Sequence, residues 1–169
     1  TVEDAVGRGG GVTGEALARK RAVVAGALAQ RKPDANDPVD VLAKVGGFDL
    51  AAMTGVFLGA AESRLPVVID GFISVVAALC AVRLCPAARD HLFASHGSFE
   101  RGYAVAAQAL SLTPVLTLGM RLGEGSGCPL GFRVLEAACA AMNGMATFDE
   151  ARIDDGYLAP IREKDCFSI

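Results

Sequence analysis

The chain has 169 residues, enough for one domain with a substantial core, and its 52% hydrophobic and 21% charged residues are typical of a globular protein rather than a disordered one. Its formal net charge is −3 and no basic stripe is visible, which excludes nucleic acid as a main partner. The most apolar stretch, residues 65–84, contains Asp70 and Arg83 and is therefore too interrupted for a membrane span.

The use of cysteine indicates the compartment of the protein. The five cysteines are irregularly spaced, and four of them lie in apolar helical contexts where buried free thiols are usual. A zinc site would require closer pairs with histidine partners, so no metal site is predicted. No secretion signal is present, and a reducing, cytoplasmic compartment is expected.

Because the chain starts at Thr1 in loop-like sequence, we expect a processed or truncated product.

The first part of the chain predicts successive helices. The glycine-rich segment GRGGGVTG leads into a helix over residues 14–30, where apolar residues recur at helical spacing. Two prolines in RKPDANDP end this helix. The segment DPVDVLAKVGG predicts a short helix with Asp37 as N-cap and Pro38 at its first position. A further helix over about residues 49–64 is rich in small residues, which predicts close packing on a neighbour.

From residue 65 onward, candidate strands alternate with helices. LPVVID, residues 65–70, predicts a buried parallel strand ending in Asp70, and HLFASHGS and TPVLTLGM are the second and third candidate strands. The helices between and after them are GFISVVAALCAVRL, ERGYAVAAQALSL and the apolar pattern after EGSG. This order predicts an α/β fold, a Rossmann-like three-layer parallel sheet with flanking helices, incomplete in this fragment. Residues 1–150 would form this domain and residues 151–169 a polar tail.

Glu124 raises the sharpest question, because it lies between two glycines just before a helix. Glycine allows close approach of the backbone to a ligand, and a helix N-terminus offers free N–H groups to an anion. The segment LGEGSG could therefore hold a catalytic carboxylate beside an anion site. The alternative is that Glu124 is a loop acid that caps the helix.

Three other loops are candidates for a site: GRGGGVTG, IDGFIS and ASHGSFERGY. Ligands gather at the carboxyl ends of parallel strands, and glycine amides with Lys20 would form a phosphate site. The alternatives are structural: a solvated Lys20, a turn serine at Ser98, and Asp70 as N-cap of the helix after it. No dinucleotide-binding, P-loop or nucleophile-elbow motif is present.

Long segments of the chain, over about residues 6–151, resemble the C-terminal half of one family. DPVDVLAKVGGFDLAAMTGVFLGAAESRLPVVIDGFIS, LFASHGS and RLGEGSG…MATFDEA are similar to nicotinate-nucleotide–dimethylbenzimidazole phosphoribosyltransferases. The resemblance implies transfer of phosphoribose from nicotinate mononucleotide to 5,6-dimethylbenzimidazole. The products would be α-ribazole 5′-phosphate and nicotinate, in assembly of the cobalamin lower loop. It also implies a cytoplasmic homodimer that uses no cofactor or metal.

The resemblance assigns roles by motif. Glu124 of RLGEGSG corresponds to the family's catalytic base, Asp70 to an active-site acid, and Leu122 to a residue lining the benzimidazole pocket. The positions that hold the phosphate and ribose of the nucleotide correspond to Gly9, Lys20, Ser98 and Gly127.

The chain also departs from the family. Gly10 stands where the family usually has Thr, and Phe99, Arg101 and Tyr103 stand where it usually has Ala, Pro and His. The tail after Ile153 has no counterpart. The family's N-terminal half, which completes the benzimidazole pocket and carries a second functional glutamate, is missing. The alternative is therefore a non-catalytic nucleotide-binding or interaction fragment, and we expect the fragment alone to be inactive.

Overall fold

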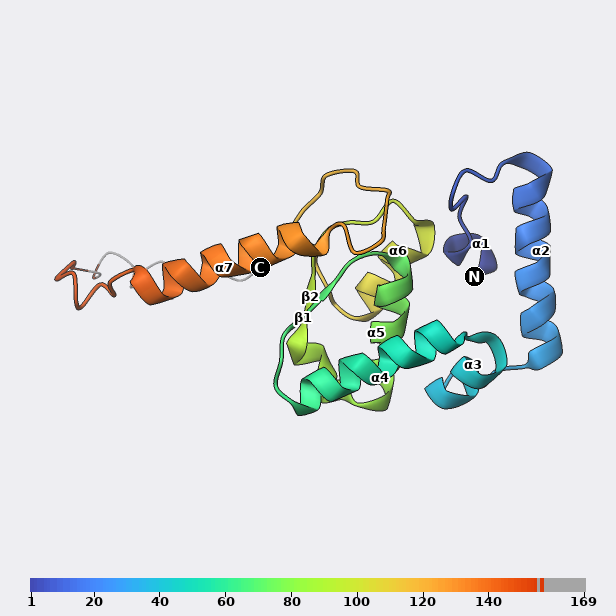
Figure 1. The fold of residues 1–169 in the computed structure, drawn as a ribbon, viewed down its shortest axis with the longest axis horizontal. Coiled ribbons are helices and arrows are strands. Elements are labelled where there is room, and N and C mark those ends of the chain that lie inside the picture. The colour runs from blue at the N-terminus through green and yellow to red at the C-terminus, as the bar shows by residue number, and fades with distance from the viewer. Residues whose placement is uncertain (155, 157–169) are drawn as a thin grey trace. The chain divides into compact units, whose positions relative to one another are not determined.

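The computed structural model describes residues 1–154 and 156, and the chain divides into two compact units, Thr1–Val134 and Leu135–Ile169 (Figure 1). The first unit opens with four helices: α1 (Val2–Ala5), α2 (Gly14–Arg31), α3 (Pro38–Val45) and α4 (Phe48–Glu62). Asp37 caps α3 as predicted, since its Oδ1 accepts hydrogen bonds from the N–H groups of Val39 at 2.9 Å and Asp40 at 3.2 Å. Pro38 occupies the first turn.

A short parallel sheet follows these helices in the chain. Strand β1 (Val67–Ile69) pairs with β2 (Leu92–Ala94), with Val67 opposite Leu92 and Ile69 opposite Ala94. The crossover between the strands consists of α5 (Phe72–Leu84) and the 3₁₀ helix η1 (Pro86–His91). Parallel strands require such a crossover, so the predicted α/β class is confirmed.

The third candidate strand forms only a single parallel bridge, between His96 and Leu116. The N–H of Val115 donates to the Ala94 carbonyl at 3.1 Å, and that of Leu116 to the Ser95 carbonyl at 3.1 Å. Pro114 has no N–H to donate to a ladder, and Gly119 has a left-handed backbone, φ +63°, that a strand does not adopt. The segment therefore continues the sheet beside β2 without becoming a full strand.

The core lies where α4, α5 and α6 (Arg101–Ala109) pack with the two strands. The small residues of α4 predicted close packing on a neighbour, and α4 packs against α5. The best-buried members are Ile69, Val75, Ala77, Ala78, Ala81 and Ala94.

Helix α7 (Cys128–Gly144) begins in the first unit and continues in the second. The predicted tail falls in the second unit and, apart from residues 151–154 and 156, lies outside the described residues. Within residues 1–154 and 156, none of the helices has both the length and the hydropathy needed to cross a bilayer.

Candidate active site

Asp70 lies directly after β1 and is only 9% exposed. Its Oδ1 accepts a hydrogen bond from the N–H of Gly127 at 2.8 Å, and its Oδ2 accepts one from the N–H of Gly125 at 3.1 Å. The alternative that Asp70 caps the following helix is not what the structure has, because the N-cap of α5 is Gly71 and no side chain makes a capping hydrogen bond there. The carboxylate is committed to a loop more than fifty residues away in the sequence.

The loop that Asp70 holds has an unusual backbone. Gly123, Glu124 and Gly125 are consecutive residues in the left-handed region, at φ +76°, +57° and +76°. Glycine adopts this conformation freely, whereas a residue with a Cβ is strained there by roughly 1–2 kcal/mol. Glu124 is thus the one side chain carried on a turn that favours glycine, which is a common property of functional positions.

Glu124 does not cap α7. Its side chain is exposed and has no hydrogen bond or ion pair within the part of the chain that the structure describes. The amides of Gly125 and Gly127, just before this helix, donate to the Asp70 carboxylate, whose negative charge also suits the positive end of the helix dipole. The Glu124 side chain is therefore left exposed while Asp70 binds the amides beside it.

A buried serine–histidine pair faces Asp70. The Ser95 hydroxyl donates to the carbonyl of Ile69 at 2.7 Å and lies 3.0 Å from Nδ1 of His96. Because the only hydroxyl hydrogen of Ser95 goes to that carbonyl, Nδ1 of His96 must carry a proton to complete the second bond. Nδ1 also lies 3.7 Å from Oδ1 of Asp70, a contact that is longer than a hydrogen bond. Ser95 is therefore a structural donor, consistent with the lack of a nucleophile motif.

Gly127 is packed against this pair. A Cβ at this position would overlap Nδ1 of His96 and would lie 2.8 Å from Oγ of Ser95, which is closer than atoms approach without displacement. Only glycine brings the start of α7 this close to the end of the sheet.

Gly9 and Lys20 come together in a second region of the first unit. Gly9 has φ +55°, and Lys20 Nζ donates to the carbonyl of Gly7 at 3.2 Å. Beside them is a pocket of about 560 Å³ that is rich in arginine and has one carboxylate, that of Glu100. Its lining residues are Gly7, Arg8, Gly9, Gly11, Thr13, Leu17, Arg21, Phe99, Glu100, Arg101 and Arg121. The glycine-rich segment indicated this region, whereas the contributions of Arg101 and Arg121 depend on the tertiary fold.

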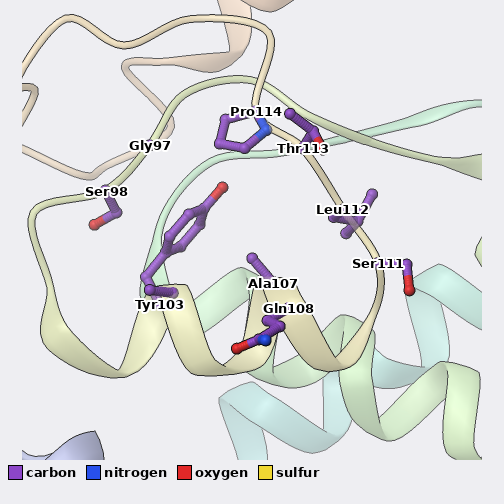
Figure 2. A pocket seen from close by; sticks show the side chains of 10 residues that line it. Gly97, Ser98, Tyr103, Ala107, Gln108, Ser111, Leu112, Thr113 and Pro114 are labelled. Atoms are coloured by element: carbon purple, nitrogen blue, oxygen red, sulfur yellow. The ribbon is translucent and has the colours of Figure 1, made fainter. Parts of the chain in front are cut away.

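Ser98 lies on the rim of a different pocket, of about 640 Å³, formed by α6 and the loop that follows it (Figure 2). Its Oγ accepts a hydrogen bond from the N–H of Glu100 at 3.3 Å, as in the turn-serine alternative. In Figure 2 the Tyr103 ring rises from α6 toward Pro114. Its hydroxyl is buried with no hydrogen-bond partner in the described chain, and burial, followed by the Asp70 charge, raises the pKa of Tyr103. The loop around residues 98–101 thus borders both pockets.

The remaining candidates are less enclosed. Leu122 is 75% exposed, so no wall of a base pocket covers it within residues 1–154 and 156.

The cysteines differ in burial. Cys80 and Cys128 are partly buried, but Cys85 and Cys139 are exposed, so the expectation of buried thiols holds for only part of the set. Burial, followed by the Asp70 charge, raises the pKa of the Cys128 thiol. No group of three potential metal ligands occurs in the described ranges.

Comparison with known proteins places the chain in a class. A model of the phosphoribosyltransferase family matches residues 1–153, which include the parallel sheet, the arginine-lined pocket and the Glu124 loop. The class is therefore that of the phosphoribosyltransferases.

Individual relatives define the family further. The chain is 51% identical over 164 residues, or 97% of its length, to a protein of Clostridium perfringens strain ATCC 13124, and 54% identical over 152 residues to one of Roseiflexus sp. strain RS-1. Both are named nicotinate-nucleotide–dimethylbenzimidazole phosphoribosyltransferase. The crystal structure of CobT from Thermus thermophilus is similar with a TM-score of 0.84 and 46% identity, over 92% of this chain. The chain belongs to the nicotinate-nucleotide–dimethylbenzimidazole phosphoribosyltransferase family.

The chain spans less than half the length of these relatives, covering 45% of the Clostridium protein, 43% of the Roseiflexus protein and 46% of the Thermus structure.

Proposed function

We propose that this chain contributes the catalytic base and part of the nucleotide site to the transfer of phosphoribose from nicotinate mononucleotide to 5,6-dimethylbenzimidazole. The observation that carries the proposal is the exposed, unbonded Glu124 on a left-handed turn that Asp70 holds in place. The products are α-ribazole 5′-phosphate and nicotinate. The names of the relatives support this pair of substrates.

In the proposed reaction one benzimidazole nitrogen attacks the anomeric carbon of the ribose. A new C–N bond forms as the bond to nicotinate breaks, and the electrons of the broken bond return to the pyridinium nitrogen. The other benzimidazole nitrogen carries a proton, which Glu124 accepts as bonding develops. Nicotinate leaves without needing an acid, and a single inversion converts the β-nucleotide to the α-product.

The nucleotide phosphate is assigned to the arginine-lined pocket beside Gly9 and Lys20. Backbone N–H groups of a glycine-rich loop and cationic side chains are the groups that bind phosphate. Four arginines and one glutamate line this pocket, so its charge favours a phosphate. Such anchoring contributes positioning of the anomeric carbon rather than chemistry. Ser98 and Gly127 are proposed to border the ribose, and Leu122 the benzimidazole.

The remaining segment of the complete enzyme is proposed to close the benzimidazole pocket over Leu122, in a cytoplasmic homodimer. A second candidate function is a non-catalytic nucleotide-binding fragment. The exposure of Leu122 and the 45% coverage of the Clostridium relative favour that alternative for the 169-residue chain alone.

The test uses the completed enzyme, which is this chain fused to the N-terminal portion of the Clostridium perfringens relative. Glu124→Gln keeps the shape of the side chain but cannot accept the proton, so we expect kcat to fall by about 10²–10⁴-fold. Affinity for nicotinate mononucleotide, measured by calorimetry, should change little. Near-normal formation of α-ribazole 5′-phosphate by this variant would eliminate Glu124 as the base.

A further inference from the structure

We propose that Asp70, supported by His96 and Ser95, is a positioning residue that acts on the reaction through the backbone amides of the Glu124 loop, without touching substrate. The inference is based on the hydrogen bonds that connect the ends of β1 and β2 with each other and with the loop just before α7. The inference rests on the proposed role of Glu124.

The two amides that Asp70 binds lie immediately C-terminal to Glu124. The N–H groups of Gly125 and Gly127 converge on one carboxylate, and backbone N–H groups that converge in a turn form a concave site that binds anions. In this chain the anion is internal, because one carboxylate oxygen takes the N–H of Gly125 and the other takes the N–H of Gly127. The bidentate contact fixes the orientation of the loop as well as its position.

Asp70 is flanked by two buried side chains from the end of β2. Ser95 binds the carbonyl of Ile69, the residue just before Asp70, and so ties the end of β1 to the end of β2. Nδ1 of His96 bonds Ser95 and lies 3.7 Å from Oδ1 of Asp70, longer than a hydrogen bond, so the imidazole, only 2% exposed, packs beside the carboxylate. Because Gly127 has no side chain, the imidazole lies directly against the start of α7.

This arrangement separates Asp70 from substrate binding. An anionic ligand at the N-terminus of α7 would compete with the carboxylate already bound there and would be repelled by it. The phosphate is better placed in the arginine-lined pocket. Asp70 thus raises the population of loop conformations in which Glu124 reaches the benzimidazole N–H, an effect on kcat rather than on nucleotide affinity.

The first measurement needs no activity and uses the 169-residue chain. Asp70→Asn replaces one carboxylate oxygen by an amide nitrogen that cannot accept a hydrogen bond. We expect hydrogen exchange at the amides of Gly125 and Gly127, followed by NMR, to become at least about tenfold faster, the factor that 1.4 kcal/mol of lost protection gives. The amide of Val75 in the core reports whether the fold is intact. The matched control is Asp90→Asn, at an exposed carboxylate of η1. Unchanged exchange at both glycine amides would overturn the proposal that Asp70 holds the Glu124 loop.

The second measurement is a double-mutant cycle in the completed enzyme. Asp70→Asn should lower kcat about 10²-fold, the cost of a misplaced catalytic group, with little change in KM for nicotinate mononucleotide. Because Asp70 acts through Glu124, the double variant with Glu124→Gln should be no slower than Glu124→Gln alone. Additive losses, or a large rise in KM with kcat retained, would show that Asp70 contacts substrate. If Glu124→Gln alone is fully active, the assignment of Glu124 as the base fails. The hydrogen-exchange result still shows whether Asp70 holds the loop.

His96 provides an independent rescue test. The side-chain amide of asparagine places an N–H close to the position of Nδ1, so His96→Asn should retain more of kcat than His96→Ala. Equal losses of kcat in the two variants, with the Val75 amide still protected, would show that His96 does not help to position Asp70.

Discussion

At the residue scale, the site depends on one position where any side chain is excluded and on another where a side chain is kept despite strain. Gly127 is the first, because a Cβ there would enter the space of His96. Glu124 is the second, at φ +57° between two glycines that adopt the same conformation freely. The same short loop thus contains both a packing constraint, at Gly127, and a side chain kept in a conformation that favours glycine, at Glu124.

Gly127→Ala should destabilise the chain by about 1–3 kcal/mol, the usual cost of overpacking, because the added methyl meets a buried imidazole. Urea unfolding of the 169-residue chain measures the change. Gly55→Ala in α4 is the matched control, since no atom lies within 4 Å of its added Cβ. Helix propensity predicts a gain of about 0.5–1 kcal/mol for the control. Equal effects of the two substitutions would contradict the contact with His96.

At the element scale, the Glu124 loop combines local turn bonds with contacts from elsewhere in the fold. The N–H of Ser126 donates to the Gly123 carbonyl at 2.9 Å and that of Cys128 to the Gly125 carbonyl at 3.0 Å, and the Asp70 carboxylate adds two bonds from the end of β1. The stability of the loop and its chemistry should therefore be separable.

Glu124→Gly tests this separation. Relief of left-handed strain contributes roughly 1–2 kcal/mol, and the greater freedom of glycine in the unfolded chain offsets about 0.4–1 kcal/mol of that gain. We expect a net stabilisation on the order of 0.5–1 kcal/mol in urea unfolding, together with loss of transfer activity in the completed enzyme. A clear loss of stability would mean that the Glu124 side chain has a structural role.

At the scale of the whole molecule, the first unit has an open sheet edge. β2 is bonded to β1 on one side and to the segment at Leu116 on the other, whereas β1 has no second strand among the described residues. Large apolar side chains in the same unit are also exposed, including Phe48 at 98% and Val56 at 65%. Unpaired edges and exposed apolar surface favour association.

We therefore expect the purified 169-residue chain to self-associate in light scattering and to show negligible phosphoribosyl transfer. Supplying the N-terminal portion of a relative, fused or in trans, should restore activity and reduce the association. A monodisperse monomer with full activity would place the catalytic site or the domain boundary elsewhere.

The sequence by itself determined most elements and the family. Helical spacing predicted α2 to α7, capping chemistry predicted the Asp37 cap, and short apolar runs predicted β1 and β2, because these signals are local; the short helices α1 and η1 were not predicted. The long motifs around Asp70 and Glu124 predicted the family, which the relatives confirm. The third strand was overestimated because its apolar pattern does not reveal how few ladder bonds a segment after Pro114 can make.

Only the tertiary structure decided what Asp70 does. Its position after a strand and before a helix fits a helix cap as well as a site acid, and no local rule distinguishes them. The choice depends on amides more than fifty residues away and on the buried Ser95 and His96 between the strand end and α7. Contacts between segments so distant in the chain leave no periodic signal in the sequence, because they depend on how the strand ends and the start of α7 come together in space.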